Sequence, residues 1–344
     1  MLAAVTMGHG GQDETVLRAD WNVPDIGPGQ GLVRVTAAAL NNTDIWSRAG
    51  AYGTTENPEA IAGWRGVPLD FPRIQGIDAA GVVQDVGANV DTSWIGRRVI
   101  VDPTVEYHGE FPVRVLGSEV DGGFAQFTLA TEAQLFDVTD SPLTDAQLAC
   151  LPTAYGTALG LINRAGCAPG QRVLVTGSSG GVGSAAIQLL LTRGCHVIAR
   201  TSPGKAEAVR ETGVAEVSVR GLDPLADLAE VDRVIDVVGG DEFGELLDRL
   251  RDGGRMATAG AIAGPVVQFD IRRLYLRQRT LVGSTMHTPT DFAELCETAR
   301  RGAIRPVVGG TFPLEELAAA QARFLTKDFV GKLVVEPWAQ AENT

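Results

Sequence analysis

An apolar strand, a glycine-rich loop and a helix follow one another in the middle of this 344-residue chain, and this order limits the possible folds most. The strand is expected over 173–176, the loop over 177–183 and the helix over 184–192, with a second apolar strand over 196–199. This succession is typical of a parallel α/β sheet. Glycines let the backbone approach a diphosphate closely, and free N–H groups at the start of a helix bind the anion.

The loop therefore predicts a dinucleotide-binding site. The residues expected to contact the phosphates are Ser179, Gly180, Gly181 and Val182. The alternative interpretation is a tight turn between strand and helix that binds no ligand. The complete unit of strand, loop, helix and strand favours the binding site over the simple turn.

The segment after the second strand favours NADPH over NADH. A site for NADH usually places a carboxylate about 20 residues after the glycines, where it binds the ribose 2′-hydroxyl. No Asp or Glu is present from Ser184 through Ala206. Hydroxyls and cations that can bind a 2′-phosphate are present instead, and the candidates are Arg200, Thr201, Ser202, Lys205 and Arg220. The alternative is that the cations are solvated surface residues of an acidic protein.

The pattern of strands changes near residue 150. Before it, short strands such as 31–38 are bounded by turn residues, which favours an antiparallel, barrel-like β domain. After it, strands alternate with helices, and a helix over 291–301 and a strand over 332–335 return to the style of the first part. We therefore expect a β-rich domain made of residues 1–150 and 289–344, and a doubly wound parallel sheet in residues 151–288.

Composition and charge exclude several classes of function. The chain has 29 Lys and Arg against 42 Asp and Glu, a net charge of −13, which argues against nucleic-acid or anionic-lipid partners. No apolar run approaches the ~18 residues of a membrane-spanning helix, and the first residues lack the basic region of a signal peptide. We expect a cytoplasmic protein. The four cysteines and four histidines are scattered, without the spacing of zinc ligands, so the cysteines are expected to be reduced, buried thiols.

Several motifs in a fixed order resemble the medium-chain dehydrogenase/reductase superfamily, and within it the zinc-free quinone oxidoreductase-like branch. The motifs are Asn41–Asp44, Gly76–Val83, Pro152–Ala158, the loop Ser178–Gly183, Leu250–Arg255 and Gly331–Val334. The resemblance covers nearly the whole chain. It implies an α/β protein with a GroES-like catalytic domain, a Rossmann domain and a cleft between them.

Departures from the family pattern argue against a catalytic metal. In the zinc alcohol dehydrogenases of this superfamily, two cysteines and a histidine hold the metal, and the matching positions here are Asn41, Ile77 and Thr153. Isoleucine cannot bind a metal, and amide or hydroxyl oxygens bind zinc poorly. The four-cysteine structural zinc lobe of those relatives is also missing from the sequence. We therefore expect no metal.

The resemblance also suggests residues for the reaction. It places Asn41 near the nicotinamide and makes Thr157 a cofactor contact. Tyr52 and Tyr155 carry the hydroxyls best placed in sequence to polarise a carbonyl or deliver a proton. For Tyr52 the alternative is a packing aromatic at the wall of the cleft. Asp44 is expected to cap the helix that begins after Thr43 rather than to act as an acid.

Further cofactor contacts are implied at the ends of later strands and near the C terminus. They are Gly239, Ala259, Gly260, Ser284 and Lys332, and each of them can equally be a turn or core residue. The strand over 280–283 can pair with its copy across a two-fold axis, so the resemblance implies a homodimer.

A segment after Tyr52 is longer than compact family members need. The segment 53–70 is about fifteen residues longer than its counterpart in compact members of the family. A long loop without regular structure is often functional. Trp64 in this segment can stack on a planar substrate or anchor a surface loop. The sequence does not decide between these roles for the 53–73 region.

These observations predict an NADPH-dependent enzyme that transfers hydride, without zinc, to a quinone, an enone or alkenal, or a related electrophilic carbonyl compound. One alternative is a redox-neutral biosynthetic lyase or cyclase on the same scaffold. Another is a non-catalytic NADPH-binding protein, because a Rossmann fold does not guarantee chemistry. The sequence does not name the substrate.

Overall fold

Six parallel strands form the sheet that follows residue 150, in the spatial order β13-β12-β11-β14-β15-β16. The computed structural model describes residues 1–54 and 69–340. The strands are β11 (Arg172–Val175), β12 (His196–Thr201), β13 (Glu216–Val219), β14 (Val231–Asp236), β15 (Leu250–Thr258) and β16 (Thr280–Gly283). The chain runs outward from β11 to β13 and then returns to the other side of β11. The strand order therefore reverses between β11 and β14, where sheets of this kind bind ligands.

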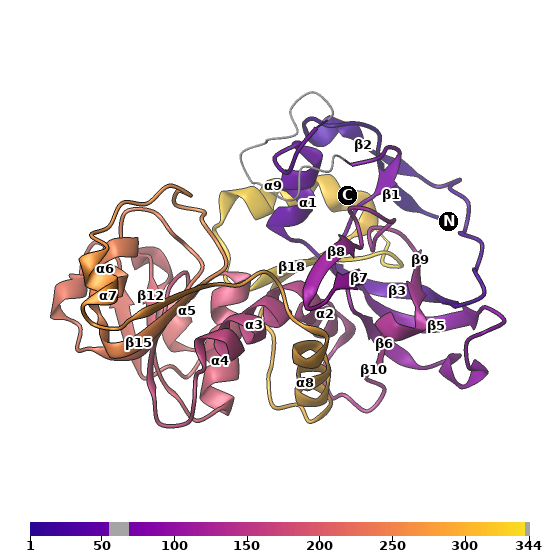
Figure 1. Ribbon diagram of the computed structural model, residues 1–344. Helices are drawn as coiled ribbons and strands as arrows, with labels where there is room; N and C mark the ends of the chain where they lie inside the picture. The colour runs from indigo at the N-terminus through magenta and orange to yellow at the C-terminus, as the bar shows by residue number, and fades with distance from the viewer. Residues whose placement is uncertain (55–68, 341–344) are drawn as a thin grey trace.

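Helices cover this sheet, as the alternating pattern predicts (Figure 1). They are α3 (Gly156–Ala165), α4 (Gly181–Thr192), α5 (Ala206–Arg210), α6 (Phe243–Asp248) and α7 (Arg272–Tyr275). Helix α4 begins at Gly181, earlier than the predicted 184, because the last residues of the glycine loop already form its first turn. Helix α5 is short, because residues 203–205 form a 3₁₀ turn before it and Gly213 takes a φ of +86° after it.

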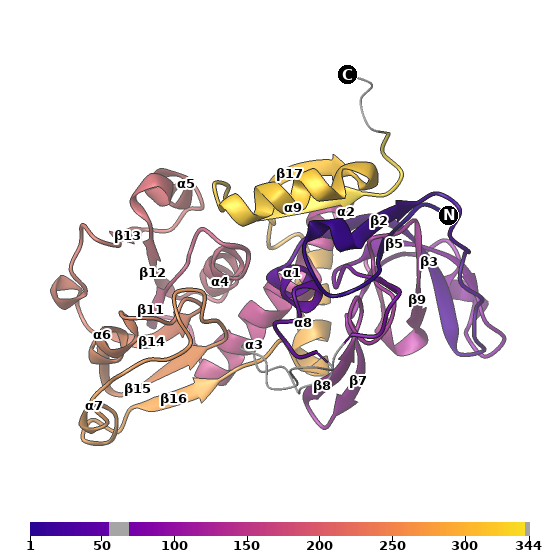
Figure 2. The same cartoon turned by 90° about the horizontal axis from the view of Figure 1, so that it is seen from above.

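Mostly antiparallel strands build the other lobe, with the order β10-β6-β5-β3-β18-β17 and β9 added on β3. They are β3 (Gln30–Ala39), β5 (Ala80–Val86), β6 (Arg98–Val101), β9 (Phe127–Thr131), β10 (Leu135–Asp137), β17 (Val308–Pro313) and β18 (Lys332–Glu336). Strand β18 comes from the C-terminal part and pairs with β3 through Val334 and Ala39. The C-terminal segment thus returns to the first lobe, and the two lobes lie side by side in Figure 2.

Smaller elements complete this lobe. Two short sheets are formed by β1 (Ala3–Thr6), β2 (Thr15–Arg18) and β4 (Arg73–Ile74), and by β7 (Thr104–His108) and β8 (Phe111–Val115). Its helices are α1 (Asn42–Arg48), α2 (Asp145–Ala149), α8 (Pro289–Arg300) and α9 (Leu317–Thr326). No helix in the described part of the chain is long and apolar enough to cross a membrane.

The lobes share a buried junction. The chain passes from α2 through a π-helical turn, Leu151–Tyr155, directly into α3. One apolar cluster includes residues of α2, α3, α4 and α8, so it joins the Rossmann sheet to the β-rich lobe. All four cysteines are buried and unpaired, as predicted. This continuous core fixes the position of the cleft that lies above the carboxyl ends of the parallel strands.

Candidate active site

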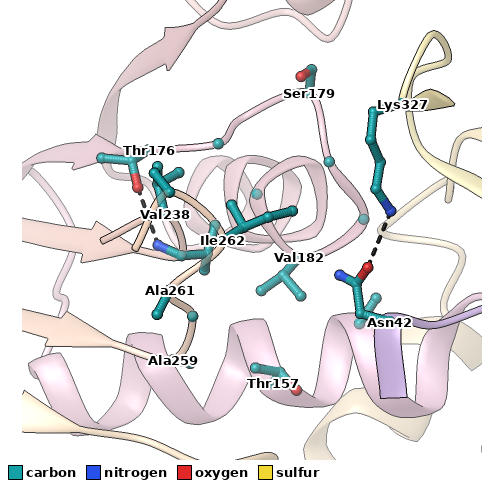
Figure 3. Close-up of a pocket in the computed structure, with 18 of the residues that line it drawn as sticks. Asn42, Thr157, Thr176, Ser179, Val182, Val238, Ala259, Ala261, Ile262 and Lys327 are labelled. Carbon is teal, nitrogen blue, oxygen red and sulfur yellow. Dashed lines mark hydrogen bonds between the residues drawn. The ribbon is translucent and has the colours of Figure 1, made fainter. Parts of the chain in front are cut away.

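A cavity of about 720 Å³ lies between the two lobes, and most of the predicted site residues line it. The Rossmann sheet contributes the glycine loop and the segments that follow β12, β14 and β15. The other lobe contributes the start of α1 and the segment from the end of α9 to the start of β18. Figure 3 shows Ser179, Val182, Ala259 and Thr157 around this space, facing Lys327 and Asn42.

The glycine loop has the geometry of a diphosphate site. Ser179, Gly180, Gly181 and Val182 line the cavity, and α4 begins at Gly181 and continues for 12 residues. A Cβ added to Gly183 would lie 2.2 Å from the carbonyl oxygen of Gly177, so only glycine permits this tight approach. The backbone N–H groups at the start of α4 are therefore open to an anion.

A buried carboxylate holds the neighbouring turn after β14. Asp236 Oδ1 accepts hydrogen bonds from Thr176 Oγ1 at 2.6 Å and from the backbone N of Val238 at 3.2 Å. The backbone N of Gly239 donates to Asp236 Oδ2 at 3.2 Å. Burial raises the pKa of Asp236, and these donors oppose the rise. The sequence analysis missed this residue, although a carboxylate at the end of an apolar strand was a usable signal.

Two lysines from different lobes meet at one end of the cavity. Lys327, at the C-terminal end of α9, donates to Asn42 Oδ1 at 3.1 Å (Figure 3) and lies 3.4 Å from the centroid of the Phe324 ring. Burial, together with the charge of Lys205, lowers the pKa of Lys327 to about 8. Burial also lowers the pKa of Lys205. An anion bound between the two lysines would relieve their repulsion. The sequence analysis missed Lys327, which lies just before the Gly331–Val334 motif.

An unsatisfied hydroxyl accompanies these cations. Thr201 lines the cavity, its side chain is buried, and its Oγ1 has no hydrogen-bond partner among the described residues. Ser202 and the exposed Arg220 also line the cavity. A buried hydroxyl without a partner is costly unless a ligand binds it. Thr201 therefore fits the predicted contact with the ribose or phosphate of a dinucleotide.

Arg200 does not fit its predicted role. Its Nε and Nη2 donate to the two oxygens of Glu242 at 3.0 and 2.6 Å, and its Nη1 donates to Ser218 Oγ at 2.6 Å and to the carbonyl oxygen of Asp223 at 3.2 Å. The protein itself neutralises this guanidinium and occupies most of its donors. The interpretation of Arg200 as a ligand of the 2′-phosphate is therefore corrected: Arg200 holds Glu242 at the wall of the cavity.

The other end of the cavity contains a buried polar network. Lys332 Nζ donates to Asn41 Oδ1 at 2.6 Å and to Asp78 Oδ2 at 2.7 Å. Asn41 Nδ2 donates to the same Asp78 oxygen at 2.9 Å, and the backbone N of Thr153 donates to Asp78 Oδ1 at 2.8 Å. Asn41, Thr153 and Lys332 line the cavity. We call the four residues Asn41, Asp78, Thr153 and Lys332 the floor network.

Asp44 supports the floor network from below. It closes a capping box with Asn41, whose backbone N donates to Asp44 Oδ2 at 2.8 Å, which confirms the predicted capping role. The backbone N of Ile77 donates to its other oxygen at 3.0 Å. Burial, together with the charge of Asp78, raises the pKa of Asp44 to about 7 against the opposing effect of the two backbone hydrogen bonds. The cap therefore fixes both Asn41 and the segment that carries Asp78.

The two tyrosines have different positions. Tyr52 lines the cavity, and its ring lies 6.1 Å from that of Trp46; burial raises the pKa of its phenol. Tyr155 is only 2% exposed, belongs to the apolar core and is not among the described residues that line the cavity. Its predicted catalytic role is therefore corrected to packing, because its side chain points into the junction core beside the π-helical turn.

In the described structure, most of the remaining predicted cofactor contacts line the cavity, and one does not. Those that line the cavity are Thr157, Gly239, Ala259 and Gly260. Ser284 is 8% exposed and is not among the described residues that line the cavity, and its role as a cofactor contact stays a prediction. Trp64 and most of the 53–73 region lie outside the described residues.

Comparison with known proteins identifies the family. Residues 27–140 match the model of the alcohol dehydrogenase GroES-like domain, and residues 181–301 match that of the zinc-binding dehydrogenase. An acryloyl-coenzyme A reductase from Sulfurisphaera tokodaii is 31% identical over 92% of this chain and 95% of its own length. The chain belongs to the medium-chain dehydrogenase/reductase superfamily. The predicted resemblance and the predicted fold are therefore confirmed.

Other members of this superfamily of oxidoreductases are also similar along the whole chain. Quinone oxidoreductase from Homo sapiens is 27% identical over 94% of each protein. A crystal structure of a candidate alcohol dehydrogenase from Sinorhizobium meliloti is 43% identical, has a TM-score of 0.91 and covers 98% of this chain and 96% of that one. The named reductases among these relatives place the chain in the quinone oxidoreductase-like branch.

The side chains at the three metal-ligand positions do not fit the zinc ion that the name of the zinc-binding dehydrogenase family implies. Zinc in the alcohol dehydrogenases is held at the positions of Asn41, Ile77 and Thr153. Here Asn41 Oδ1 already accepts the ammonium of Lys332, and the buried Ile77 offers only hydrocarbon, packed with Val115 and Met286. A metal cation would meet a positive charge and too few ligand atoms. Asn41, Ile77 and Thr153 therefore do not form a zinc site in this chain.

Proposed function

We propose that this medium-chain dehydrogenase/reductase is an NADPH-dependent, zinc-independent reductase of quinones, enones, alkenals and related electrophilic carbonyl compounds. The observation that carries the proposal is the pair Lys205 and Lys327: both residues line the cavity where it borders the turn after β12, and burial lowers the pKa of each. This turn has hydroxyls and no carboxylate between Arg200 and Ala206. Such a surface favours a 2′-phosphate over a free 2′-hydroxyl.

The relatives support the same substrate class. One is named for the reduction of acryloyl-coenzyme A and another for the reduction of quinones. Both kinds of substrate carry a carbon–carbon double bond conjugated to a carbonyl group. A site for either substrate has to bind a compound that accepts hydride and develops negative charge on oxygen.

Different residues of the cavity bind different parts of NADPH. The glycine loop, Ser179–Val182, binds the diphosphate through backbone N–H groups and the positive end of α4. Thr201, Ser202 and the two lysines hold the 2′-phosphate. When bound, NADPH supplies a hydride. Thr157 and Asn41 border the space where the nicotinamide is expected.

Apolar and aromatic side chains line the end of the cavity that contains the floor network. We call this end, where hydride transfer is expected, the reaction end. Leu40, Trp46 and Tyr52 line the cavity next to the floor network. They exclude water and so strengthen the interactions of nearby charges with a developing oxyanion. The Tyr52 hydroxyl is the phenol placed to hold a proton near the substrate, whereas Tyr155 is not.

Titration of the purified protein with NADPH and NADH, followed by nucleotide fluorescence, tests the cofactor. We expect NADPH to bind at least about tenfold more tightly, because charge-assisted hydrogen bonds contribute roughly 1.5–3 kcal/mol each. Equal affinities, or no binding, would contradict the proposal. Consumption of NADPH with 1,4-benzoquinone, 2-alkenals and enoyl thioesters then tests the substrate class. Tight cofactor binding without turnover of any of them would favour a redox-neutral enzyme or a binding protein.

We also propose a homodimer. Strand β16 ends the parallel sheet in the described structure, and apolar side chains are exposed on the preceding helix, with Tyr275 59% and Leu276 69% exposed. An unpaired strand edge beside apolar surface favours pairing with a second copy. Light scattering after gel filtration should give twice the 36.2 kDa chain mass, and Tyr275→Glu should shift the mass toward one chain. A monomeric wild type would contradict the proposal.

A further inference from the structure

The floor network contains a buried positive charge, that of Lys332, which the sequence suggested only as a cofactor contact. The side chain of Lys332 is 5% exposed and that of Asp78 is fully buried, and their charged atoms are 2.7 Å apart. Lys332 nevertheless lines the cavity. Its aliphatic part passes beneath the glycine loop, since its Cγ is 3.1 Å from the position of a Cβ on Gly181. The ammonium is therefore held at the reaction end.

The hydrogen bonds of the network leave few groups available to a substrate. Both N–H groups of the Asn41 amide are used, one by Asp78 Oδ2 and one by the carbonyl oxygen of Ala39 at 3.1 Å. The Asn41 amide therefore has no N–H left to donate to a ligand. Both oxygens of Asp78 are occupied as well. A lysine ammonium has three donors, and two of them bind Asn41 and Asp78.

The location of this charge matches that of the metal in zinc-containing relatives. Two of the three metal-ligand positions, Asn41 and Thr153, contact either the ammonium or its carboxylate partner directly. The third, Ile77, is adjacent in sequence to Asp78. The floor network thus brings a protein cation to the place where those relatives hold a metal cation, and Asp78 keeps the cation in position.

The proposed reaction needs such a charge. When hydride forms a bond to the β-carbon of an enone, the π electrons of the double bond move onto the carbonyl oxygen. A proton from solvent then binds the α-carbon and completes the reduction. The enolate oxygen carries the negative charge between these events. Positive groups fixed in a dry site stabilise such charge more than water does.

We propose that the ammonium of Lys332 stabilises the enolate oxygen, in the place of a metal ion. This assignment rests on the proposed reductase function. Asp78 and Asn41 act as positioning residues, because they hold the ammonium and do not donate to the substrate. The remaining N–H of Lys332 is the donor toward the oxyanion.

The ionisation of a bound phenol tests the proposal without catalysis. The phenolate of 4-nitrophenol resembles an enolate oxygen, and its absorbance reports its charge. In the complex of wild type with NADP⁺, the pKa of the bound phenol should fall by roughly one unit or more relative to the complex of Lys332→Met. The same ionisation in both proteins would overturn the proposal. Lys327→Met is the matched control: it removes another cation of the cavity, and it should weaken NADP⁺ binding without changing the ionisation of the phenol.

A substrate series gives a second, independent readout. With para-substituted benzylideneacetones, Lys332→Met should lower kcat about a hundredfold for the least activated members. Electron-withdrawing substituents should partly rescue the variant, so the dependence of log kcat on the substituent becomes steeper. A merely structural role would lower kcat by one factor for all members and leave this slope unchanged.

Controls separate charge stabilisation from folding and from the proposed function. Lys332→Met leaves Asp78 buried without its partner, which destabilises the fold. The double variant Lys332→Met, Asp78→Asn removes both charges, so its melting temperature should recover while the phenol shift stays lost. If wild type neither binds NADPH nor reduces any enone, the proposed function fails. If wild type does both and Lys332→Met keeps the phenol shift and the slope, only the role of Lys332 fails.

Discussion

The two ends of the cavity use lysine in opposite ways. At the phosphate end, Lys205 and Lys327 have no carboxylate within ion-pair distance in the described part of the chain, and burial lowers the pKa of both. At the floor network, Lys332 lies 2.7 Å from Asp78 and is held in one position. Open cations are suited to bind an anionic ligand, whereas a paired and buried cation is suited to act on a charge that develops beside it.

Removal of the open cations should have the largest effect. In the double variant Lys205→Met, Lys327→Met, we expect the Kd of NADPH to rise about a hundredfold, because each lost charge-assisted bond costs roughly 1.5–3 kcal/mol. The Kd of NADH should change little, since it lacks the 2′-phosphate. Fluorescence titration of both nucleotides measures the ratio. Equal losses for NADPH and NADH would show that the lysines do not bind the 2′-phosphate.

Asp44, which caps the helix beside the floor network, should make the free energy of unfolding depend on pH. Burial raises the pKa of Asp44 to about 7, so folded Asp44 stays protonated at pH values where the unfolded chain has lost the proton. Its contribution to the free energy of unfolding is complete below pH 4 and lost as pH rises through 7. Between pH 5 and 7 the loss is about 2 kcal/mol. Urea unfolding of wild type between pH 5 and 7 should show this fall in the unfolding free energy, and Asp44→Asn should show a smaller dependence on pH.

A matched carboxylate controls for that measurement. Asp20 is exposed and pairs with Arg18 on the surface, and this pair lowers the pKa of Asp20, so Asp20→Asn should leave the slope of the unfolding free energy between pH 5 and 7 as in wild type. Parallel slopes for wild type and Asp44→Asn would contradict the assignment of a proton to buried Asp44.

The open cations should also make cofactor binding depend on pH. Because the pKa of Lys327 is about 8 in the free protein, the lysine has to take up a proton to bind a phosphate above that pH. The Kd of NADPH should therefore rise by up to about tenfold per pH unit above pH 8. Lys327→Arg keeps its charge and should remove this dependence. An unchanged Kd from pH 7 to 9.5 in wild type would show that Lys327 is not at the phosphate.

Local sequence was sufficient for the phosphate end, apart from Lys327. The loop 177–183 and the turn after β12 lie in one continuous segment, and glycine spacing has a direct steric meaning there. The sequence could not show how Arg200 is used, because its partners come from other segments. Arg200 lines the cavity with Thr201, but its donors bind Ser218 and Glu242.

The reaction end shows the limit of the sequence. Asn41 was predicted from the family pattern, but its bonds to Asp78 and Lys332 join residues 37 and 291 positions away in sequence. Tyr155 was misassigned because the π-helical turn directs its side chain into the core while Thr153, two residues earlier, lines the cavity. Neither the pairing nor this rotation has a local signature.

The sequence by itself determined the two-lobed α/β fold and the glycine loop, because these depend on periodicity and on glycine sterics within short segments. The positions that replace the metal ligands came from the family resemblance. Tertiary structure alone decided which cations stay open and which are neutralised. Charge pairing depends on distances of a few ångströms between distant segments, and only the packing of β3, α1 and β18 against the Rossmann lobe sets those distances.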